Sequence, residues 1–400
     1  MIRFESVSKQ YPDGTVAVSD LSFEAPTGKI TVLVGPSGCG KTTTMRMINR
    51  MITPSSGRIL LDDQDTADLD AATLRRGIGY VIQHAGLFPH RTVLGNVASV
   101  PRLLGWPKKK SEARGRELLE RVGLPPELAG RYPAQLSGGQ QQRVGVARAL
   151  AADPPVMLMD EPFSAVDPVV REQLQDEFLR LQDELGKTIV IVTHDIDEAI
   201  KLGDQIAVFE AGGHLAQMAT PAELLSRPVN DFVADFVGKD RGYRALGFQA
   251  AGELPLHQEP TFAVGQPLAE VRSAALDNWV LVTDAGKPLG WVDLATAESS
   301  ATKGGDDRIA AESLNLGGTL VSTDGSIRST LDAALSSPSG RGVVVHDDGT
   351  FAGTVIASEV VAGLGNVPDV VGSHTSTVNA GAESPGGAES AAAVGTAEPL

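Results

Sequence analysis

The stretch that decides the fold is residues 30–42, which read ITVLVGPSGCGKT. Its first five residues, Ile30 to Val34, form a short apolar run that ends at a Gly-Pro pair, which predicts a buried β-strand. The next eight residues match GxxxxGK[ST], a loop whose backbone N–H groups point toward phosphate oxygens. In such a loop Lys41 reaches the outer phosphates and the Thr42 hydroxyl is a ligand of Mg²⁺. The predicted nucleotide site therefore contains Gly35, Pro36, Ser37, Gly38, Cys39, Gly40, Lys41, Thr42 and Thr43.

A second phosphate-binding pattern lies far downstream, where residues 136–140 read LSGGQ. Serine is a preferred residue at the start of a helix. A helix N-terminus that carries two glycines also presents its N–H groups to an anion. Many unrelated NTPases contain the first loop, whereas the two patterns together narrow the class of ATPase. We therefore add Ser137, Gly139 and Gln140 to the predicted ATP-binding residues.

Residues 1 to about 235 alternate short apolar strands with helical stretches, which indicates an α/β fold with a mostly parallel sheet. Besides residues 30–34, the informative strands are 78–82, 156–159 and 188–193, and each ends at a polar residue. The carboxyl ends of parallel strands share one edge of a sheet, and ligands bind at that edge. We therefore expect four polar side chains to meet beside the phosphate loop: Gln83, Asp160, Glu161 and His194.

These four residues predict ATP hydrolysis with Mg²⁺. Asp160 suits Mg²⁺, bound through water, and Gln83 suits the metal or a water molecule. Glu161 is the candidate to orient or deprotonate the attacking water, with a cap on the turn at Pro162 as the alternative. His194 is a candidate donor to the γ-phosphate, with a noncatalytic strand-end histidine as the alternative. The predicted catalytic residues are Glu161, His194, Lys41 and Gln83, and the predicted metal ligands are Thr42, Gln83 and Asp160.

Length and composition limit the class of protein. The 400 residues are enough for two or three folded domains. No run of about 18 apolar residues is present, and the N-terminus lacks the apolar stretch of a signal peptide, so we expect a protein that neither spans a membrane nor leaves the cytoplasm. The single cysteine, Cys39, excludes an intramolecular disulfide. The net charge of −16 comes mostly from the residues after 240 and argues against a nucleic-acid partner.

The character of the chain changes at about residues 238–247. Two weakly similar units follow, and each contains a strand, an acidic turn and a second strand. The first spans residues 280–292 and the second spans residues 342–356, which predicts an internal duplication. Residues 371–400 contain no aromatic residue, lysine or arginine, so we expect that tail to be disordered.

Residues 1–237 resemble an ATPase subunit of an ABC transporter. The family's motifs occur in order: an aromatic loop at Tyr11, the P-loop, a glutamine loop at Gln83, the signature at 136–140, Asp160-Glu161, a loop that ends at Asp167, and His194. Residues 80–90 and 47–50 resemble importers of glycine betaine, choline, carnitine or proline. The C-terminal units, at 245–310 and 311–368, resemble the tandem CBS pair of those ATPases. The resemblance implies an α/β P-loop ABC ATPase domain with a helical subdomain, then a small α+β CBS-like pair and the tail.

The same resemblance implies how the subunit acts. It implies a head-to-tail homodimer in which Ser137 and Gly139 of one copy act on the ATP of the other, with Asp167 at the interface. The resemblance also implies that the Tyr11 ring stacks on adenine. The segment after Gln83 contacts an integral membrane permease, and an extracellular substrate-binding protein is an indirect partner. The chain is then a peripheral motor on the cytoplasmic face of the membrane, and the solute never touches it.

The C-terminal units depart from the family pattern at two places. The adenosine-binding pattern of CBS units is incomplete at residues 290–296 and 353–359, where only Glu359 approximates the acidic ribose partner. The pair is therefore interpreted as a regulator that senses ionic strength or as a dimerisation scaffold. The alternative functions are the motor of an importer for another small solute, a soluble ABC ATPase that acts on nucleic acid or ribosomes, and a regulator that does not hydrolyse ATP.

Overall fold

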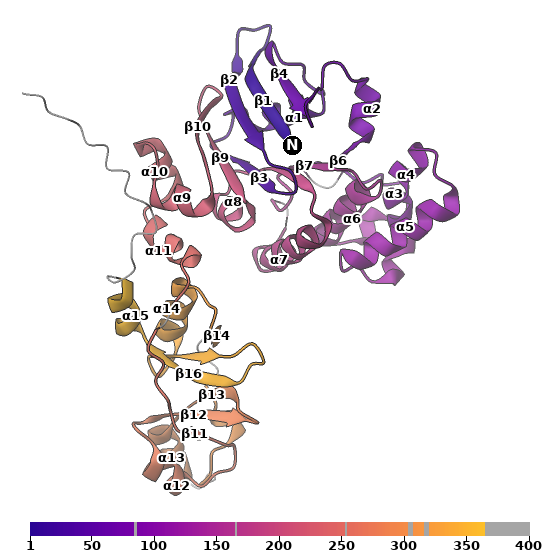
Figure 1. The fold of residues 1–400 in the computed structure, drawn as a ribbon. Coiled ribbons are helices and arrows are strands. Elements are labelled where there is room, and N and C mark those ends of the chain that lie inside the picture. The colour runs from indigo at the N-terminus through magenta and orange to yellow at the C-terminus, as the bar shows by residue number, and fades with distance from the viewer. Residues whose placement is uncertain (84–85, 165, 253, 303–306, 316–319, 365–400) are drawn as a thin grey trace, which may run out of the picture.

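The computed structural model describes residues 1–83, 86–164, 166–252, 254–302, 307–315 and 320–364 (Figure 1). Its central sheet has six strands in the order β10-β9-β3-β8-β7-β6. Every residue of β3, β7 and β8 is buried, as expected for parallel strands that are covered on both faces. The strands predicted at 30–34, 78–82, 156–159 and 188–193 are confirmed to within one residue. The bounds are β3 (Ile30–Val34), β6 (Ile78–Val81), β7 (Val156–Asp160), β8 (Thr188–Val192), β9 (Gln205–Glu210) and the antiparallel β10 (His214–Ala219).

A second, antiparallel sheet covers the helix that follows the P-loop. Its order is β2-β1-β4-β5, and its apolar side chains share a core with that helix, α1 (Lys41–Ile48), and with the central sheet. The rings of Phe4 and Phe23 stack in this core at a centroid distance of 4.5 Å. The helix is thus held between two sheets. The other elements of this layer are β1 (Ile2–Gln10), β2 (Val16–Ala25), β4 (Ser56–Leu61), β5 (Gln64–Asp65) and α2 (Ala71–Arg76).

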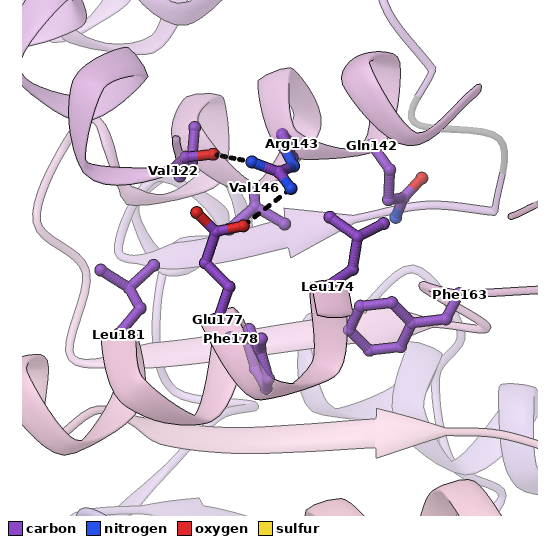
Figure 2. A pocket seen from close by; sticks show the side chains of 9 residues that line it. All are labelled: Val122, Gln142, Arg143, Val146, Phe163, Leu174, Glu177, Phe178 and Leu181. Atoms are coloured by element: carbon purple, nitrogen blue, oxygen red, sulfur yellow. Dashed lines mark hydrogen bonds and ion pairs between the residues drawn. The ribbon is translucent and has the colours of Figure 1, made fainter. Parts of the chain in front are cut away.

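A helical part lies beside the central sheet and carries the LSGGQ segment (Figure 1). It contains α3 (Val93–Val97), α4 (Ser99–Leu103), α5 (Lys108–Arg121) and α6 (Gly138–Leu150), and α6 packs near α7 (Pro168–Leu185). Figure 2 shows the contact that fixes α6: the Arg143 guanidinium lies 2.9 Å from the Glu177 carboxylate and donates to the Val122 carbonyl at 3.0 Å. The small cavity beside this pair, about 30 Å³, is far too small to hold a nucleotide.

One short helix connects β8 to β9 of the central sheet, and three more follow β10 and lead out of the ATPase fold. The connecting helix is α8 (Ile196–Leu202), and the three that follow are α9 (Pro221–Ser226), α10 (Asp231–Val237) and α11 (Arg241–Ala245). In Figure 1, α11 lies between the ATPase fold and the C-terminal sheets. Among the residues that the structure describes, none of the helices combines the length and the apolar character needed to span a bilayer.

The C-terminal part contains two three-stranded sheets of the same pattern, in which the first pair of strands is parallel and the second antiparallel. Leu281 and Trp291 of the first sheet share an apolar cluster with Val343 of the second. The assignment of CBS-like units to 245–310 and 311–368 stays a prediction, and the tail predicted at 371–400 lies outside the described residues. The elements are β11 (Thr261–Phe262), α12 (Leu268–Ala274), β12 (Trp279–Asp284), β13 (Lys287–Asp293), α13 (Leu294–Thr302), β14 (Leu320–Ser322), α14 (Ile327–Ser336), β15 (Arg341–Val345), β16 (Phe351–Ile356) and α15 (Ala357–Leu364).

Candidate nucleotide-hydrolysis site

The loop between β3 and α1 has a backbone that only glycine tolerates at two positions. Gly35 has φ 151°, and a Cβ built there would lie 2.3 Å from the Phe209 carbonyl oxygen. Gly40 has φ 98°, and its Cβ would lie 2.1 Å from the Ala17 carbonyl oxygen. A Cβ at Gly38 would meet nothing within 4 Å, so the outer side of the loop is open. The backbones of β2 and β9 therefore pack closely against one side of the loop, and the side at Gly38 is open. A loop that binds phosphate needs such an open side.

Lys41 lies inside the curve of this loop. Its side chain is buried, with the residue 7% exposed. The ammonium donates to the carbonyl oxygens of Gly35 at 2.6 Å and Pro36 at 2.8 Å, and Cys39 Sγ lies 3.6 Å away. This places a positive charge at the N-terminus of α1, where the loop N–H groups already favour an anion. Pro36, Ser37 and Gly38 are exposed on the open side of the loop, and Thr43 is half-buried on α1.

Thr42 and Asp160 form the predicted metal side of the site. The Thr42 hydroxyl donates to Asp160 Oδ1 at 3.2 Å, which links the first turn of α1 to the end of β7. Burial raises the pKa of the Asp160 carboxyl, while the Thr42 hydrogen bond and the Arg46 guanidinium lower it. Arg46 Nη2 lies 3.7 Å from Asp160 Oδ2. A hydroxyl, a carboxylate and the Gln83 amide are hard oxygen donors of the kind that Mg²⁺ prefers, so these residues fit that ion.

Glu161 is the centre of the site, because two other predicted residues contact its carboxylate. The Gln83 side-chain amide donates to Glu161 Oε2 at 2.9 Å. On the other side, His194 Nδ1 lies 3.2 Å from Glu161 Oε1. Three polar residues that end three separate strands thus converge, as predicted from the parallel topology.

The backbone of Glu161 is held in an unusual conformation. Its φ is 46°, in the left-handed region that non-glycine residues rarely adopt. The Glu161 N–H donates to the Val192 carbonyl at 2.8 Å, and the Ser164 hydroxyl donates to the Glu161 carbonyl at 3.0 Å. These bonds turn the chain sharply after β7, so that Glu161 projects differently from Asp160. Strain of this kind is common at functional sites.

The turn that carries His194 is braced by a buried carboxyl. The Thr193 hydroxyl donates to Glu198 Oε2 at 2.9 Å and accepts from the Asp195 N–H at 3.1 Å. Asp195 caps α8 by accepting from the N–H groups of Asp197 and Glu198. Glu198 is 5% exposed, and burial raises the pKa of its carboxyl to about 7. Its Oε1 accepts no hydrogen bond from any residue that the structure describes.

The signature residues lie apart from the P-loop of the same chain. Ser137 and Gln140 form a capping box at the start of α6: the Ser137 hydroxyl accepts from the Gln140 N–H at 3.3 Å, and the Gln140 amide accepts from the Ser137 N–H at 3.0 Å. Gly139 follows in the same turn. Figure 1 shows α6 with the helical part rather than beside α1. Ser137, at this helix N-terminus, is exposed.

Two further predicted residues lie at the margins of the site. Asp167 is exposed just before α7, and its carbonyl accepts from the Arg171 N–H at 2.8 Å. Tyr11 lies in the turn between β1 and β2, where the Lys9 ammonium is 5.4 Å from its ring centroid.

Sequence reasoning missed two residues that contact the site. Arg46 lies four residues after Thr42, on the same face of α1, and that spacing was the available signal. Glu198 follows Asp195 in an Asp-x-x-Glu pattern, which is a signal for a capping box. The structure uses it differently, since the Glu198 carboxyl binds the Thr193 hydroxyl.

Comparison with known proteins places this geometry in a family. Residues 18–164 match the family model described as ABC transporter. The osmoprotectant import ATP-binding protein OsmV of Salmonella typhimurium is 49% identical over 312 residues, which are 75% of this chain and 81% of that protein. The choline transport ATP-binding protein OpuBA of Bacillus subtilis is 42% identical over 377 residues, 90% of this chain and 95% of that protein.

A solved structure is also similar to this chain. The ATP-binding cassette MJ0796, a dimer bound to ADP and Pi, is 34% identical with a TM-score of 0.51, over 55% of this chain and 99% of that chain. The resemblance to ATP-binding subunits of osmoprotectant importers is confirmed by these matches. The chain therefore belongs to the ABC transporter family and is one of its ATP-hydrolysing subunits.

Proposed function

We propose that this chain powers an importer for osmoprotectants such as glycine betaine, choline, carnitine or proline. The observation that carries the proposal is the Glu161 carboxylate, held between Gln83 and His194 beside the P-loop. The two similar ATP-binding proteins, one for osmoprotectant import and one for choline transport, supply the class of solute. The second of those matches spans 90% of this chain, so it extends into the C-terminal units.

In the proposed mechanism, a water oxygen attacks the γ-phosphorus of ATP, and the Glu161 carboxylate accepts the proton that this water molecule loses. The bond to the bridging oxygen breaks, and ADP leaves with the electron pair. Lys41 and the loop N–H groups offset charge on the outer phosphates, and His194 donates to the γ-phosphate. Thr42, Asp160 and Gln83 would hold Mg²⁺, which when bound offsets phosphate charge. Gln83 also orients Glu161.

The proposed assembly is a head-to-tail homodimer with two permease subunits. Ser137, Gly139 and Gln140 of one copy would complete the nucleotide site of the other, with Asp167 between them and Tyr11 against adenine. The dimeric ATP-binding cassette among the solved structures supports a dimer. Docking of the segment after Gln83 on a permease would keep the subunit on the cytoplasmic face of the membrane. A substrate-binding protein would be an indirect partner, and no nucleic acid would be involved.

The proposed domain division is an ATPase domain at 1–237 and CBS-like units at 245–310 and 311–368. We assign the pair a regulatory role toward the motor. Unchanged ATPase activity and unchanged salt dependence after truncation at Val237 would exclude that role.

The test of the proposed function is solute uptake in the host. Uptake of radiolabelled glycine betaine, choline, carnitine and proline is measured before and after a salt upshift, in a deletion strain restored with wild type or Glu161→Gln. We expect salt-stimulated uptake to be lost on deletion and rescued only by wild type. Unchanged uptake of all four solutes would contradict the solute class and leave the ATPase assignment in place.

A further inference from the structure

Helix α11 contacts the ATPase fold through Arg244. The Arg244 side chain is only 17% exposed, and its Nη1 lies 2.9 Å from Asp197 Oδ1 in the first turn of α8. The same guanidinium lies 2.9 Å from Asp240 through Nε and donates to the Val237 carbonyl at 3.3 Å. The guanidinium thus has three acceptors and little exposure, while the Asp197 and Asp240 side chains are 68% and 57% exposed.

The same helix contacts the second C-terminal sheet through the neighbouring residue. Tyr243 and Leu246 pack against the apolar core of the unit that contains β14, β15 and β16. The Tyr243 hydroxyl donates to the Asp332 carboxylate on α14. The Arg328 guanidinium, also on α14, lies 5.0 Å from the Tyr243 ring centroid. Two adjacent residues of α11 thus hold two different parts of the chain.

The ATPase end of this connection lies close to the catalytic cluster. Asp197 donates its N–H to Asp195 at 2.9 Å, and Asp195 donates its N–H to the Thr193 hydroxyl at 3.1 Å. His194 lies between Thr193 and Asp195 in the sequence, and its Nδ1 is 3.2 Å from Glu161 Oε1. A displacement of Asp197 would therefore move the turn that positions His194.

We infer that α11 couples the C-terminal sheets to the His194 turn, and that Arg244 is a positioning residue for ATP hydrolysis through Asp197. This inference rests on the proposed role of His194. The relay runs from Asp332 through Tyr243 and Arg244 to Asp197. It gives the C-terminal part a physical route to the catalytic turn without contact with the nucleotide.

The test is a double-mutant cycle on the kcat of ATP hydrolysis by the purified full-length chain. We expect Asp197→Asn and Arg244→Gln each to lower kcat by about 3- to 10-fold with KM for ATP changed by less than about 2-fold. The double variant should be no slower than the slower single variant, since both remove one interaction. Arg244→Lys, which retains one ion pair with Asp197, should keep more of the activity than Arg244→Gln.

Two further variants locate the effect. Asp240→Asn removes the other ion pair of Arg244 and should leave kcat unchanged. Tyr243→Phe keeps the ring but removes the bond to Asp332. It should lower kcat in the wild-type background and have no further effect beside Asp197→Asn. The inference would be overturned if the kcat losses of the two single variants multiplied in either double variant, Asp197→Asn with Arg244→Gln or Asp197→Asn with Tyr243→Phe. An unchanged kcat in Arg244→Gln would also overturn it.

A parallel His194→Ala variant separates this inference from the function on which it rests. Wild-type hydrolysis by His194→Ala would remove the proposed role of His194 itself. An inactive His194→Ala together with multiplicative cycles would overturn only the coupling through α11.

Discussion

His194 Nδ1 lies 3.2 Å from Glu161 Oε1, although 33 residues separate the two along the chain. The contact joins the ends of β8 and β7, which are neighbours in the central sheet. Gln83 donates to the other oxygen of the same carboxylate, so Glu161 is held from both sides. This arrangement fixes the candidate base before a water molecule and a γ-phosphate arrive, which is the form of preorganisation that lowers a hydrolytic barrier.

Loss of His194 should slow chemistry and spare ATP binding. The His194→Ala variant removes a contact to Glu161 and the proposed donor to the γ-phosphate. We expect kcat to fall by about 10²- to 10³-fold, with the dissociation constant for ATP nearly unchanged. Steady-state hydrolysis and equilibrium ATP binding check this. The exposed His214 on β10 offers a matched control, His214→Ala, which should hydrolyse ATP normally; an active His194→Ala would exclude the donor role.

Loss of the Thr42 hydroxyl should weaken the response to Mg²⁺. The Thr42→Val variant keeps the shape of the side chain but removes the bond to Asp160 and the predicted metal ligand. We expect the Mg²⁺ concentration for half-maximal hydrolysis to rise by about 10-fold or more. Binding of ATP without Mg²⁺ should change little. Thr42→Ser keeps the hydroxyl and should behave as wild type, and a Thr42→Val titration identical to wild type would exclude this ligand.

The two positive-φ glycines Gly40 and Gly14 should respond differently to alanine. At Gly40 the added Cβ would lie 2.1 Å from the Ala17 carbonyl oxygen, so the loop has to move and ATP binding should be lost. We expect the free energy of unfolding to fall by about 2–4 kcal/mol. At Gly14 a Cβ meets nothing within 4 Å, and only about 1 kcal/mol of backbone strain is expected. Denaturant unfolding and ATP binding are measured for Gly40→Ala and Gly14→Ala. Equal losses of stability in the two variants would contradict the steric conflict at Gly40.

The buried Glu198 should make stability depend on pH. Burial raises the pKa of its carboxyl from 4.5 to about 7 in the folded state, so the unfolded chain loses this proton first. The stability that the protonated form contributes is complete below about pH 4.5 and is lost as the pH rises through 7. We expect Glu198→Gln to be more stable than wild type at pH 8 by at most about 3 kcal/mol, and nearly equal to it at pH 4.5.

Denaturant unfolding of wild type and Glu198→Gln at pH 4.5 and pH 8 provides the measurement. The exposed Glu184 on α7 supplies the control, because Glu184→Gln should change the unfolding free energy equally at both pH values. A difference between wild type and Glu198→Gln that does not grow with pH would contradict the assigned burial effect.

Local sequence predicted the central sheet and the converging residues well. Short apolar runs bounded by Gly and Pro marked β3, and parallel topology brought Gln83, Glu161 and His194 to one edge. The antiparallel sheet was not predicted in this detail, because β1 pairs with β4, more than forty residues further on. Such pairings depend on packing against α1 rather than on local pattern.

The contacts that brace the site were beyond reach from sequence for a related reason. The Glu198 carboxyl turns toward Thr193 instead of the Asp195 N–H because the tertiary core buries it. The local sequence around Tyr243 and Arg244 predicts nothing more than a short polar helix. Their importance follows from the two partners, Asp197 and Asp332, that only the folded chain brings to them.

The most direct test of the account is the turnover of Glu161→Gln against its affinity for ATP. The amide keeps the size of the side chain but cannot accept the proton of the attacking water. We predict that kcat falls by about 10²- to 10⁴-fold while the dissociation constant for ATP stays nearly unchanged. Near-normal turnover in this variant would contradict the assignment of Glu161 as the base and with it the proposed hydrolysis mechanism.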